Sequence, residues 1–476
     1  MYEHHVTSSE GVTQDPGATA ANGIVIIGGG LAAARTAEQL RRAGYEGQLT
    51  IVSDEVHLPY DRPPLSKEVL RSEVDDVSLK PREWYDEKGI TLRLGSAATG
   101  LDTAAQTVTL ADGTVLGYDE LVIATGLVPR RIPAFPELEG IRVLRSFDEC
   151  MALRSHASAA KRAVVIGAGF IGCEVAASLR GLGVEVVLVE PQPTPLAAVL
   201  GEQIGELVAR LHRSEGVDVR TGVGVAEVRG DGHVDTVVLA DGTQLDADLV
   251  VVGIGSHPAT GWLDGSGIAV DNGVVCDAAG RTSAPNVWAL GDVASWRDQM
   301  GHQVRVEHWS NVADQARVVV PAMLGREVSS NVVVPYFWSD QYDVKIQCLG
   351  EPHSTDVVHL VEDDGRKLLA YYQRDGVLVG VVGGGVPGKV MKVRAKIAAA
   401  VPISEMLDES QGQTSARIPA RGAGPGGPLV RWPTLTKSGR WRAEKATASS
   451  PVARADGIGL EPGPRRTASW PDVPGT

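Results

Sequence analysis

The chain contains 476 residues, of which 43% are hydrophobic and 22% are charged, so its composition is that of a globular protein with about two to four domains. Its 56 Gly and 27 Pro residues are too few for a fibrous or low-complexity protein. The 45 Lys and Arg residues against 59 Asp and Glu residues give a formal net charge of −14, which argues against general binding to nucleic acid or to an anionic membrane.

The two ends of the chain differ from its middle. Residues 1–21 are polar and show no hydrophobic period, which predicts a disordered leader. From Gln411 onward, ten basic residues stand against four acidic ones among nine Pro and ten Gly residues, and we predict a disordered basic tail over residues 406–476. This tail is interpreted either as a solvated extension without a role or as an electrostatic tether for an acidic partner. Because the chain has neither a signal-peptide pattern nor an apolar run of about 18 residues, the sequence predicts a cytoplasmic protein without a membrane span.

The spacing of the four cysteines indicates neither a disulfide scaffold nor a zinc site. They are Cys150, Cys173, Cys276 and Cys348, and no two of them form a C-x-x-C pair. We therefore predict reduced, buried thiols and no bound metal.

Two segments of the chain show the order strand, turn, helix and strand of a β-α-β unit. The first has an apolar strand at 24–27, a helix at 31–43 and a second strand at 49–53. The second has a strand at 163–166, a helix that ends near residue 182 and a strand at 186–189. Each unit predicts a parallel pair of strands joined by a right-handed crossover.

A glycine fingerprint joins strand to helix in the first unit. Gly28, Gly30 and Ala33 form the pattern G-x-G-x-x-A. The first position allows a tight turn, the second lets the backbone approach a pyrophosphate at the helix N-terminus, and the third lets helix and strand pack closely. Asp54 or Glu55 ends the next strand, where a carboxylate binds a ribose diol.

The second unit carries the complete fingerprint Gly167, Gly169 and Gly172, followed at the end of the next strand by Glu190. A carboxylate there accepts a hydrogen bond from a ribose 2′-hydroxyl and repels a 2′-phosphate, so we expect NADH to be preferred over NADPH. The alternative is that Glu190 is merely exposed at a strand end. Two dinucleotide sites in one chain indicate electron transfer between two cofactors, usually a nicotinamide and a flavin.

An internal repeat extends beyond the fingerprints. Residues 107–126 align without gaps on residues 236–255, and 11 of the 20 positions are identical. Each copy has an Asp-Gly turn between strands and ends in an apolar strand and a Gly, which indicates a duplicated domain. The first copy is longer than the second. We expect much of the additional length to lie in the segment 57–67, whose prolines exclude a regular helix or a central strand. An irregular insertion at this end of a strand is where ligand sites form in open α/β sheets.

Further motifs accompany these features in a fixed order: GGGLAAA, PYDRPPLSK, ATGLVPR, GAGFIGCEVA, ALGDVA, VEHWSNVADQA and PYFWSDQYDVKIQ. Over about residues 23–405, this combination resembles the FAD-dependent, NADH-using ferredoxin reductases of oxygenase systems, of the putidaredoxin, rhodocoxin and biphenyl-dioxygenase type. It is more distantly similar to apoptosis-inducing factor. The leader and the tail lie outside the shared pattern.

The expected fold class is α/β, with two Rossmann-like dinucleotide-binding domains arranged as in glutathione reductase, an α+β C-terminal domain and a disordered tail. The apolar run that ends at Gly291-Asp292 comes after the second copy, so we expect the NAD domain to be inserted in the FAD domain. The expected limits are 22–144 and 266–331 for the FAD domain, 145–265 for the NAD domain and 332–405 for the C-terminal domain.

The resemblance also implies roles for individual residues. Lys67 and Glu174 are implied to form an ion pair near the flavin and the nicotinamide, where the lysine offsets the negative charge that the flavin gains on reduction. From the residues alone, a solvated Lys67 and a Glu174 that favours the helix dipole in the first turn are the alternatives. Trp309 is implied to cover the isoalloxazine ring, with a core tryptophan as the alternative. Asp292 is implied to bind the ribityl chain of FAD, with a helix N-cap as the alternative.

The expected catalytic residues are Lys67, Glu174 and Trp309. The residues expected to bind FAD or NADH are Gly28, Gly30, Leu31, Ala33, Asp54, Glu55, Arg62, Lys67, Ala124, Thr125, Gly126, Arg130, Gly167, Gly169, Phe170, Ile171, Gly172, Glu190, Gly253, Gly255, Gly291, Asp292, Glu307 and Trp309.

The implied function is electron transfer from NADH through FAD to a small iron–sulfur ferredoxin that serves an oxygenase. The helix expected at 31–43 contains no cysteine, which disfavours the dithiol chemistry of disulfide reductases with this architecture. Two alternatives stay open: a flavoprotein that reduces a small acceptor such as a quinone, a radical or oxygen, and a redox-sensing interaction protein. Neither nucleic acid nor membrane is an expected partner, and a monomer and a homodimer are both compatible with the sequence.

Overall fold

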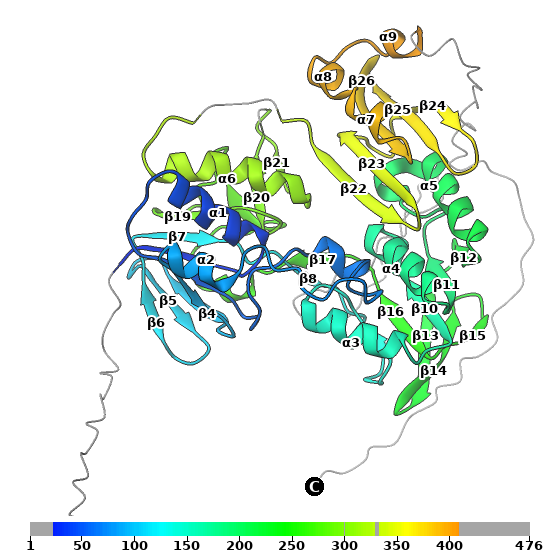
Figure 1. Ribbon diagram of the computed structural model, residues 1–476, viewed down its shortest axis with the longest axis horizontal. Helices are drawn as coiled ribbons and strands as arrows, with labels where there is room; N and C mark the ends of the chain where they lie inside the picture. The colour runs from blue at the N-terminus through cyan, green and yellow to red at the C-terminus, as the bar shows by residue number, and fades with distance from the viewer. Residues whose placement is uncertain (1–21, 299, 329–332, 409–476) are drawn as a thin grey trace, which may run out of the picture. The chain divides into compact units, whose positions relative to one another are not determined.

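The computed structural model describes residues 22–408, except residue 299 and residues 329–332, and Figure 1 labels most of its helices and strands. The predicted leader lies outside these residues, as does the predicted tail from residue 409 onward. Residues 406–408 end helix α9 (Ile403–Asp408), in which Met406 is buried. The prediction of disorder is therefore wrong for these three positions.

The first β-α-β unit builds a parallel sheet with the strand order β19-β7-β1-β2-β3. Its strands are β1 (Ile24–Ile27), β2 (Leu49–Val52), β3 (Ile90–Arg93), β7 (Glu120–Ile123) and β19 (Val287–Ala289). Helices α1 (Leu31–Arg42) and α6 (Trp309–Met323) pack their small apolar side chains on one face of it. Because β19 follows the second unit in the sequence, this sheet is assembled from two separate stretches of the chain.

The second unit builds another parallel sheet, with the order β12-β11-β10-β16-β9. Its strands are β9 (Ile141–Arg142), β10 (Arg162–Ile166), β11 (Glu185–Glu190), β12 (Asp218–Thr221) and β16 (Leu249–Val252). Its helices are α3 (Phe147–Ala157), α4 (Phe170–Gly181) and α5 (Ala197–Ser214). Strand β9 joins this sheet although it precedes residue 145, the expected start of the NAD domain.

The sequence repeat forms a small antiparallel sheet in each copy, β4-β5-β6 and β13-β14-β15. The strands are β4 (Ala98–Asp102), β5 (Thr107–Leu110), β6 (Val115–Gly117), β13 (Val225–Asp231), β14 (His233–Leu239) and β15 (Gln244–Asp246). The two copies are linked by an antiparallel pair between β8 (Leu127–Pro129) and β17 (Ser256–Pro258). Each of these two strands follows the last apolar strand of its copy.

Short elements complete the first half of the molecule. They are the 3₁₀ helices η1 (Pro63–Ser66) and η2 (Gly261–Leu263), helix α2 (Arg82–Glu87), and the sheet of β18 (Val274–Cys276), β20 (Ala294–Arg297) and β21 (Gln303–Val304). Helix η1 is the only regular element within the segment 57–67, as expected from its prolines.

The last part is a five-stranded antiparallel sheet with the order β22-β23-β26-β25-β24. Its strands are β22 (Tyr336–Gln341), β23 (Val344–Gly350), β24 (Val357–Asp363), β25 (Leu368–Arg374) and β26 (Val377–Gly384). The amphipathic stretch that follows forms two short helices, α7 (Pro387–Met391) and α8 (Arg394–Ala398). The predicted class, two Rossmann-like units followed by an α+β domain, is confirmed.

One apolar core joins helix α4 to all three parts of the fold. Buried side chains of α4, including Val175 and Leu179, share a cluster with Val69 after η1, with Leu188 of β11 and with Ile346 of β23. Helix α4 also contacts β22 directly. The helix therefore fixes the C-terminal sheet and the segment 57–67 relative to the second sheet.

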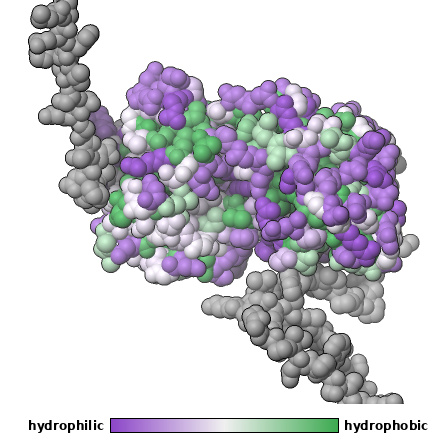
Figure 2. Space-filling model, turned by 90° about the horizontal axis from the view of Figure 1, so that it is seen from below, coloured by the Kyte–Doolittle hydropathy of each residue, from purple (hydrophilic) through white to green (hydrophobic). Residues whose placement is uncertain are grey.

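The surface in Figure 2 alternates hydrophilic residues with smaller hydrophobic areas. Within the part of the chain that the structure describes, none of the helices combines the length and the apolar character that crossing a membrane requires.

A buried tyrosine hydroxyl connects the C-terminal sheet to α5. Tyr372 of β25 is fully buried and donates a hydrogen bond of 2.8 Å to the carbonyl of Leu200. We expect Tyr372→Phe to lower the free energy of unfolding by about 1–2 kcal/mol, because the Leu200 carbonyl loses this buried donor. Chemical denaturation followed by tyrosine and tryptophan fluorescence measures the change.

Tyr118→Phe is the matched control. Tyr118 is equally buried, but its hydroxyl has no hydrogen-bond partner among the described residues, so its loss should change stability less. Equal losses of stability in both variants would contradict the role of the Tyr372 hydrogen bond.

Candidate functional site

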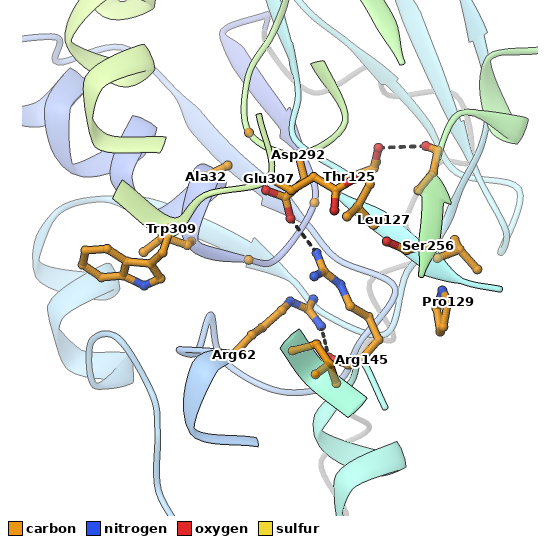
Figure 3. Close-up of a pocket in the computed structure, with 18 of the residues that line it drawn as sticks. Ala32, Arg62, Thr125, Leu127, Pro129, Arg145, Ser256, Asp292, Glu307 and Trp309 are labelled. Atoms are coloured by element: carbon orange, nitrogen blue, oxygen red, sulfur yellow. Dashed lines mark hydrogen bonds and ion pairs between the residues drawn. The ribbon is translucent and has the colours of Figure 1, made fainter. Parts of the chain in front are cut away.

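A cleft of about 900 Å³ lies at the carboxyl ends of strands from both parallel sheets. It is lined by the turn after β1, most of the segment 61–67, residues 124–129, the start of α4, residues 251–253, 255–256, 291–292 and 305–309, and Phe337 and Trp338 of β22. Ligands bind at this edge of open α/β sheets. Figure 3 shows side chains from these separate segments converging on one space.

The first fingerprint has the geometry that its glycines predict. Gly28 has φ +127°, and a Cβ there would lie 2.2 Å from the carbonyl oxygen of Ala124. A Cβ on Gly30 would instead point toward the cleft, with its nearest neighbour, the Arg62 side chain, 3.9 Å away. No side chain of the described residues caps α1, so its first N–H groups are free to bind an anion.

The second fingerprint repeats this geometry. Gly167 has φ +97°, and a Cβ there would lie 2.4 Å from the carbonyl oxygen of Gly253. A Cβ on Gly169 would meet nothing within 4 Å, whereas one on Gly172 would lie 1.9 Å from the carbonyl oxygen of Gly167. The middle glycine therefore leaves room at the N-terminus of α4, and the outer two allow the turn and the close packing.

The two carboxylates expected after β2 have different surroundings. Asp54 is exposed and lines the cleft. Glu55 accepts hydrogen bonds from the Tyr60 hydroxyl at 2.6 Å and from Nη2 of Arg62 at 2.8 Å, so its carboxylate is already engaged. This cluster holds the Arg62 side chain at the edge of the cleft.

Asp292 and Arg145 face each other inside the cleft (Figure 3). Nη2 of Arg145 lies 3.1 Å from Oδ2 of Asp292, and Nη1 of Arg62 donates to the carbonyl of Arg145 at 2.7 Å. No helix begins at Asp292, because β20 follows it. The alternative interpretation of Asp292 as a helix N-cap is therefore wrong.

Lys67 and Glu174 form a buried ion pair. Nζ of Lys67 lies 2.7 Å from Oε2 of Glu174, and their side chains are 5% and 4% exposed. The alternative of a solvated lysine is therefore wrong. Helix α4 begins at Phe170, so Glu174 is its fifth residue and lies beyond the first turn, contrary to the prediction.

Trp309 begins helix α6 and is held at the cleft by a hydrogen bond. Its Nε1 donates to Oδ1 of Asp61 at 2.7 Å, and its ring meets Trp338 edge to face with centroids 5.9 Å apart. Burial raises the pKa of Asp61, although the Trp309 hydrogen bond opposes this shift. Trp309 is thus fixed at the wall of the cleft and is only partly buried.

Most of the predicted residues, including many of those described above, line the cleft. They are Gly28, Gly30, Leu31, Asp54, Arg62, Lys67, Ala124, Thr125, Gly126, Gly169, Phe170, Ile171, Glu174, Gly253, Gly255, Gly291, Asp292, Glu307 and Trp309.

Six predicted residues do not line it. They are Ala33, Glu55, Arg130, Gly167, Gly172 and Glu190. Arg130 donates to the carbonyl of Ser256 beside the β8–β17 pair. The carboxylate of Glu190 accepts from the backbone N–H groups of Ala168 at 2.7 Å and Gln192 at 2.9 Å.

Unpartnered buried atoms test whether a dinucleotide fits the cleft. Four residues that line it each carry a buried nitrogen without a hydrogen-bond partner among the described residues. These atoms are Nε of Arg145, Nε1 of Trp262, Nε of Arg305 and Nδ1 of His308. Buried polar atoms are normally hydrogen-bonded. Helix α4, like α1, has no side-chain cap at its N-terminus among the described residues. Together with these two helix N-termini, this set of cations and donors fits ligands rich in phosphate and carbonyl oxygens.

The cysteines do not contribute a reactive thiol. All four are buried and free, and burial raises the pKa of Cys150 to about 11 and that of Cys276 to about 12. A neutral thiol is a poor nucleophile. Among the described residues, no cluster of His, Cys, Asp and Glu is arranged to hold a metal ion.

Sequence reasoning missed several residues of the cleft. Asp61 and Ser66 lie inside PYDRPPLSK, and Phe337 and Trp338 lie inside PYFWSDQYDVKIQ, so both motifs already marked the right segments. Arg145 lies in no motif, and only its contact with Asp292 identifies it.

Family comparisons cover most of the described residues. Residues 22–316 match the family described as pyridine nucleotide-disulphide oxidoreductase, and residues 336–410 match the reductase C-terminal family. The chain is 37% identical to the benzene 1,2-dioxygenase system ferredoxin–NAD(+) reductase subunit of Pseudomonas putida, over 70% of this chain and 81% of the relative. It is 38% identical to rhodocoxin reductase of Rhodococcus erythropolis, over 71% of this chain and 80% of that protein.

Solved structures lead to the same group of proteins. The covalent putidaredoxin reductase–putidaredoxin complex matches with a TM-score of 0.78 and 30% identity, over 83% of this chain and 100% of the matched chain. The ferredoxin reductase for the CYP199A2 system of Rhodopseudomonas palustris matches with a TM-score of 0.77 and 33% identity, over 81% and 96% of the two chains. The chain therefore belongs to the pyridine nucleotide-disulphide oxidoreductase family and, within it, to the ferredoxin–NAD(+) reductases that its motifs resemble.

Proposed function

We propose that this protein is an FAD-dependent oxidoreductase that transfers electrons from NADH to a small iron–sulfur ferredoxin of an oxygenase system. The observation that carries this proposal is that both glycine fingerprints open, at Gly30 and Gly169, into the same cleft. Two dinucleotides bound there would meet beside the Lys67–Glu174 pair. Relatives that are reductase components of the benzene 1,2-dioxygenase and p-cumate 2,3-dioxygenase systems support the same acceptor class.

Bound FAD supplies the conversion from a two-electron donor to one-electron acceptors, because NADH gives a hydride and an iron–sulfur centre takes one electron at a time. One NADH thus reduces two ferredoxins, with release of NAD⁺ and one proton. The protein's task is to hold the two cofactors in register and to offset charge.

We assign FAD to the first fingerprint. The N-terminus of α1 and Arg62 would neutralise its pyrophosphate, Asp54 would bind its ribose, and Asp292, oriented by Arg145, would bind its ribityl hydroxyls. Thr125 and Gly126 would lie along the cofactor, and Trp309 would cover the flavin. Lys67 would place its positive charge where the flavin gains electrons.

We assign NADH to the second fingerprint. Its pyrophosphate would bind at the N-terminus of α4, next to Gly169 and Phe170, and Glu190 would bind the adenosine ribose. The backbone N–H groups that hold Glu190 orient its carboxylate and leave each oxygen able to accept another bond. A 2′-phosphate would meet this negative charge, so NADH is the preferred donor over NADPH.

The domain limits given above, with β9 assigned to the NAD domain and residues 406–408 to the C-terminal domain, are part of the same proposal. So are a cytoplasmic location, the absence of nucleic-acid and membrane partners, and a monomeric or homodimeric state. The basic tail as a tether for an acidic ferredoxin concerns residues outside those described. The alternative function is reduction of a small acceptor such as a quinone, a radical or oxygen by the same cofactors.

The acceptor decides between these functions. Under anaerobic conditions, NADH-driven reduction of a panel of two-iron ferredoxins is compared with reduction of quinones, and oxygen reduction is measured separately in air. We expect fast reduction of at least one ferredoxin, with a rate that falls as salt rises, because oppositely charged surfaces guide the encounter. Fast turnover of a small acceptor with every ferredoxin left oxidised would contradict the proposed function.

The two middle glycines test which fingerprint binds which nucleotide. Gly30 has φ −96° and Gly169 has φ −72°, so alanine fits both backbones, and its methyl group would enter the cleft. We expect Gly169→Ala to keep its FAD and to bind NADH about 5- to 150-fold more weakly, since added bulk at a close contact costs about 1–3 kcal/mol. Gly30→Ala should instead lower the affinity for FAD.

Each of the two variants is the control for the other. FAD content is read from the absorbance of the purified protein, and NADH affinity from stopped-flow reduction of the bound flavin. A Gly169→Ala variant with a lowered FAD content, whose remaining FAD-loaded fraction was reduced with normal NADH affinity, would reverse the assignment.

A further inference from the structure

The carboxylate of Glu174 is held by three hydrogen bonds. Its Oε2 accepts from Nζ of Lys67 at 2.7 Å and from the Ser66 hydroxyl at 2.5 Å, and its Oε1 accepts from the Ser339 hydroxyl at 2.8 Å. Ser339 lies on β22 of the C-terminal sheet and is fully buried. The third bond therefore comes from a different part of the chain than the first two.

Ser339 is the first link of a longer chain of buried side chains. Nε2 of Gln341 donates to the Ser339 hydroxyl at 3.2 Å, and Oε1 of Gln341 lies 3.1 Å from Nε2 of His212. Nδ1 of His212 lies 2.8 Å from the hydroxyl of Tyr342. Gln341 and His212 are fully buried and do not line the cleft.

The direction of every hydrogen bond follows from the first. An ionised Glu174 only accepts, so Ser339 donates its one proton to it and must accept from the Gln341 amide nitrogen. The Gln341 oxygen then accepts from Nε2–H of His212, and Nδ1 accepts from Tyr342. Burial lowers the pKa of His212 to about 4, so the imidazole is neutral and this single tautomer satisfies both of its nitrogens.

All donors in the chain thus point toward Glu174. Hydrogen bonds in a row polarise one another, and a carboxylate that accepts them favours its charged form. If Glu174 were protonated, its own O–H would need an acceptor, and the carboxyl group would accept fewer hydrogen bonds from Lys67, Ser66 and Ser339. The arrangement therefore holds the carboxylate in one orientation, with Oε1 toward Ser339 and Oε2 toward Lys67 and Ser66.

Other ionisable groups near the pair do not supply this stabilisation. Burial raises the pKa of the Cys173 thiol, so it is neutral, and Asp340 is paired with Lys345 at 3.0 Å. The titratable groups packed around the pair are Lys67 at the end of η1, Cys173 on α4, Asp340 on β22, His212 on α5 and Asp61, which interacts with Lys67.

We propose that Ser339, Gln341 and His212 are positioning residues that keep Glu174 ionised, and thereby keep the Lys67 charge fixed beside the flavin site. The C-terminal sheet would then take part in the chemistry without touching either cofactor. This inference rests on the proposed function for the place of the flavin, but the state of Glu174 is measured independently of turnover.

Ser339→Ala removes the donor with almost no change in volume. Infrared difference spectra of the oxidised holoenzyme, recorded across a pH series, report the carbonyl band of a protonated carboxyl group. In Ser339→Ala the band of Glu174 should appear about one to two pH units higher than in the wild type, as expected for loss of one hydrogen bond to a charged group. The double variant Ser339→Ala with Glu174→Gln should lack this band, which assigns it.

Stopped-flow reduction of the flavin by NADH gives a second readout. In Ser339→Ala its rate should change with pH across the same interval in which the infrared band appears. Gln341→Leu breaks the chain one step further away and should shift the infrared midpoint in the same direction by less. Gln347→Leu is its matched control. Gln347 is a buried glutamine of the same sheet that donates to Tyr336, and no described hydrogen bond links it to the row of side chains between Glu174 and Tyr342.

Two results would overturn the inference. One is a Glu174 band that appears at the same pH in Ser339→Ala and in the wild type. The other is an infrared midpoint that is the same in Gln341→Leu and in Gln347→Leu. The second comparison decides the matter if Ser339→Ala fails to fold. A wild-type protein that reduced no ferredoxin would refute the proposed function, and it would leave the infrared comparison unaffected.

Discussion

The buried ion pair between Lys67 and Glu174 constrains the whole arrangement. Moving two charges out of water costs several kcal/mol per ion, and their attraction offsets this only when every remaining donor and acceptor is satisfied. Here Ser66 and Ser339 supply the additional donors to the carboxylate. The pair is therefore stable only when the segment 57–67, helix α4 and strand β22 meet at one point, and that point is the wall of the cleft.

Helix α4 is the element that makes this meeting possible. Its apolar side chains, such as Val175 and Leu179, are buried in the core shared with the second sheet and the C-terminal sheet. Its N-terminus opens toward the cleft, and its fifth residue is Glu174. One rigid helix thus sets the distance between the proposed pyrophosphate site of the donor and the charge proposed to lie beside the flavin, which is the positioning that hydride transfer requires.

The sequence predicted the parts of the site that depend on local backbone geometry. Fingerprint glycines such as Gly28 and Gly167 are recognisable from the sequence because a tight turn with positive φ, in which a Cβ would also clash with the backbone, strongly favours glycine. Contacts between distant residues were not predictable in this way. Arg145 meets Asp292, and Ser339 meets Glu174, across more than a hundred positions of the chain, and such pairs leave no local pattern. The neutral, buried state of His212 likewise depends on packing that no period in the sequence encodes.

The proposed role of Lys67 is to offset, with its positive charge, the negative charge that the flavin gains on reduction. Lys67→Gln removes the charge and keeps a hydrogen-bond donor for Glu174. The most direct measurement is the midpoint potential of the bound FAD, determined by anaerobic spectroelectrochemistry in the wild type and in this variant. We expect a lower potential in Lys67→Gln, because the reduced cofactor loses its stabilising charge. An unchanged or higher potential would contradict it.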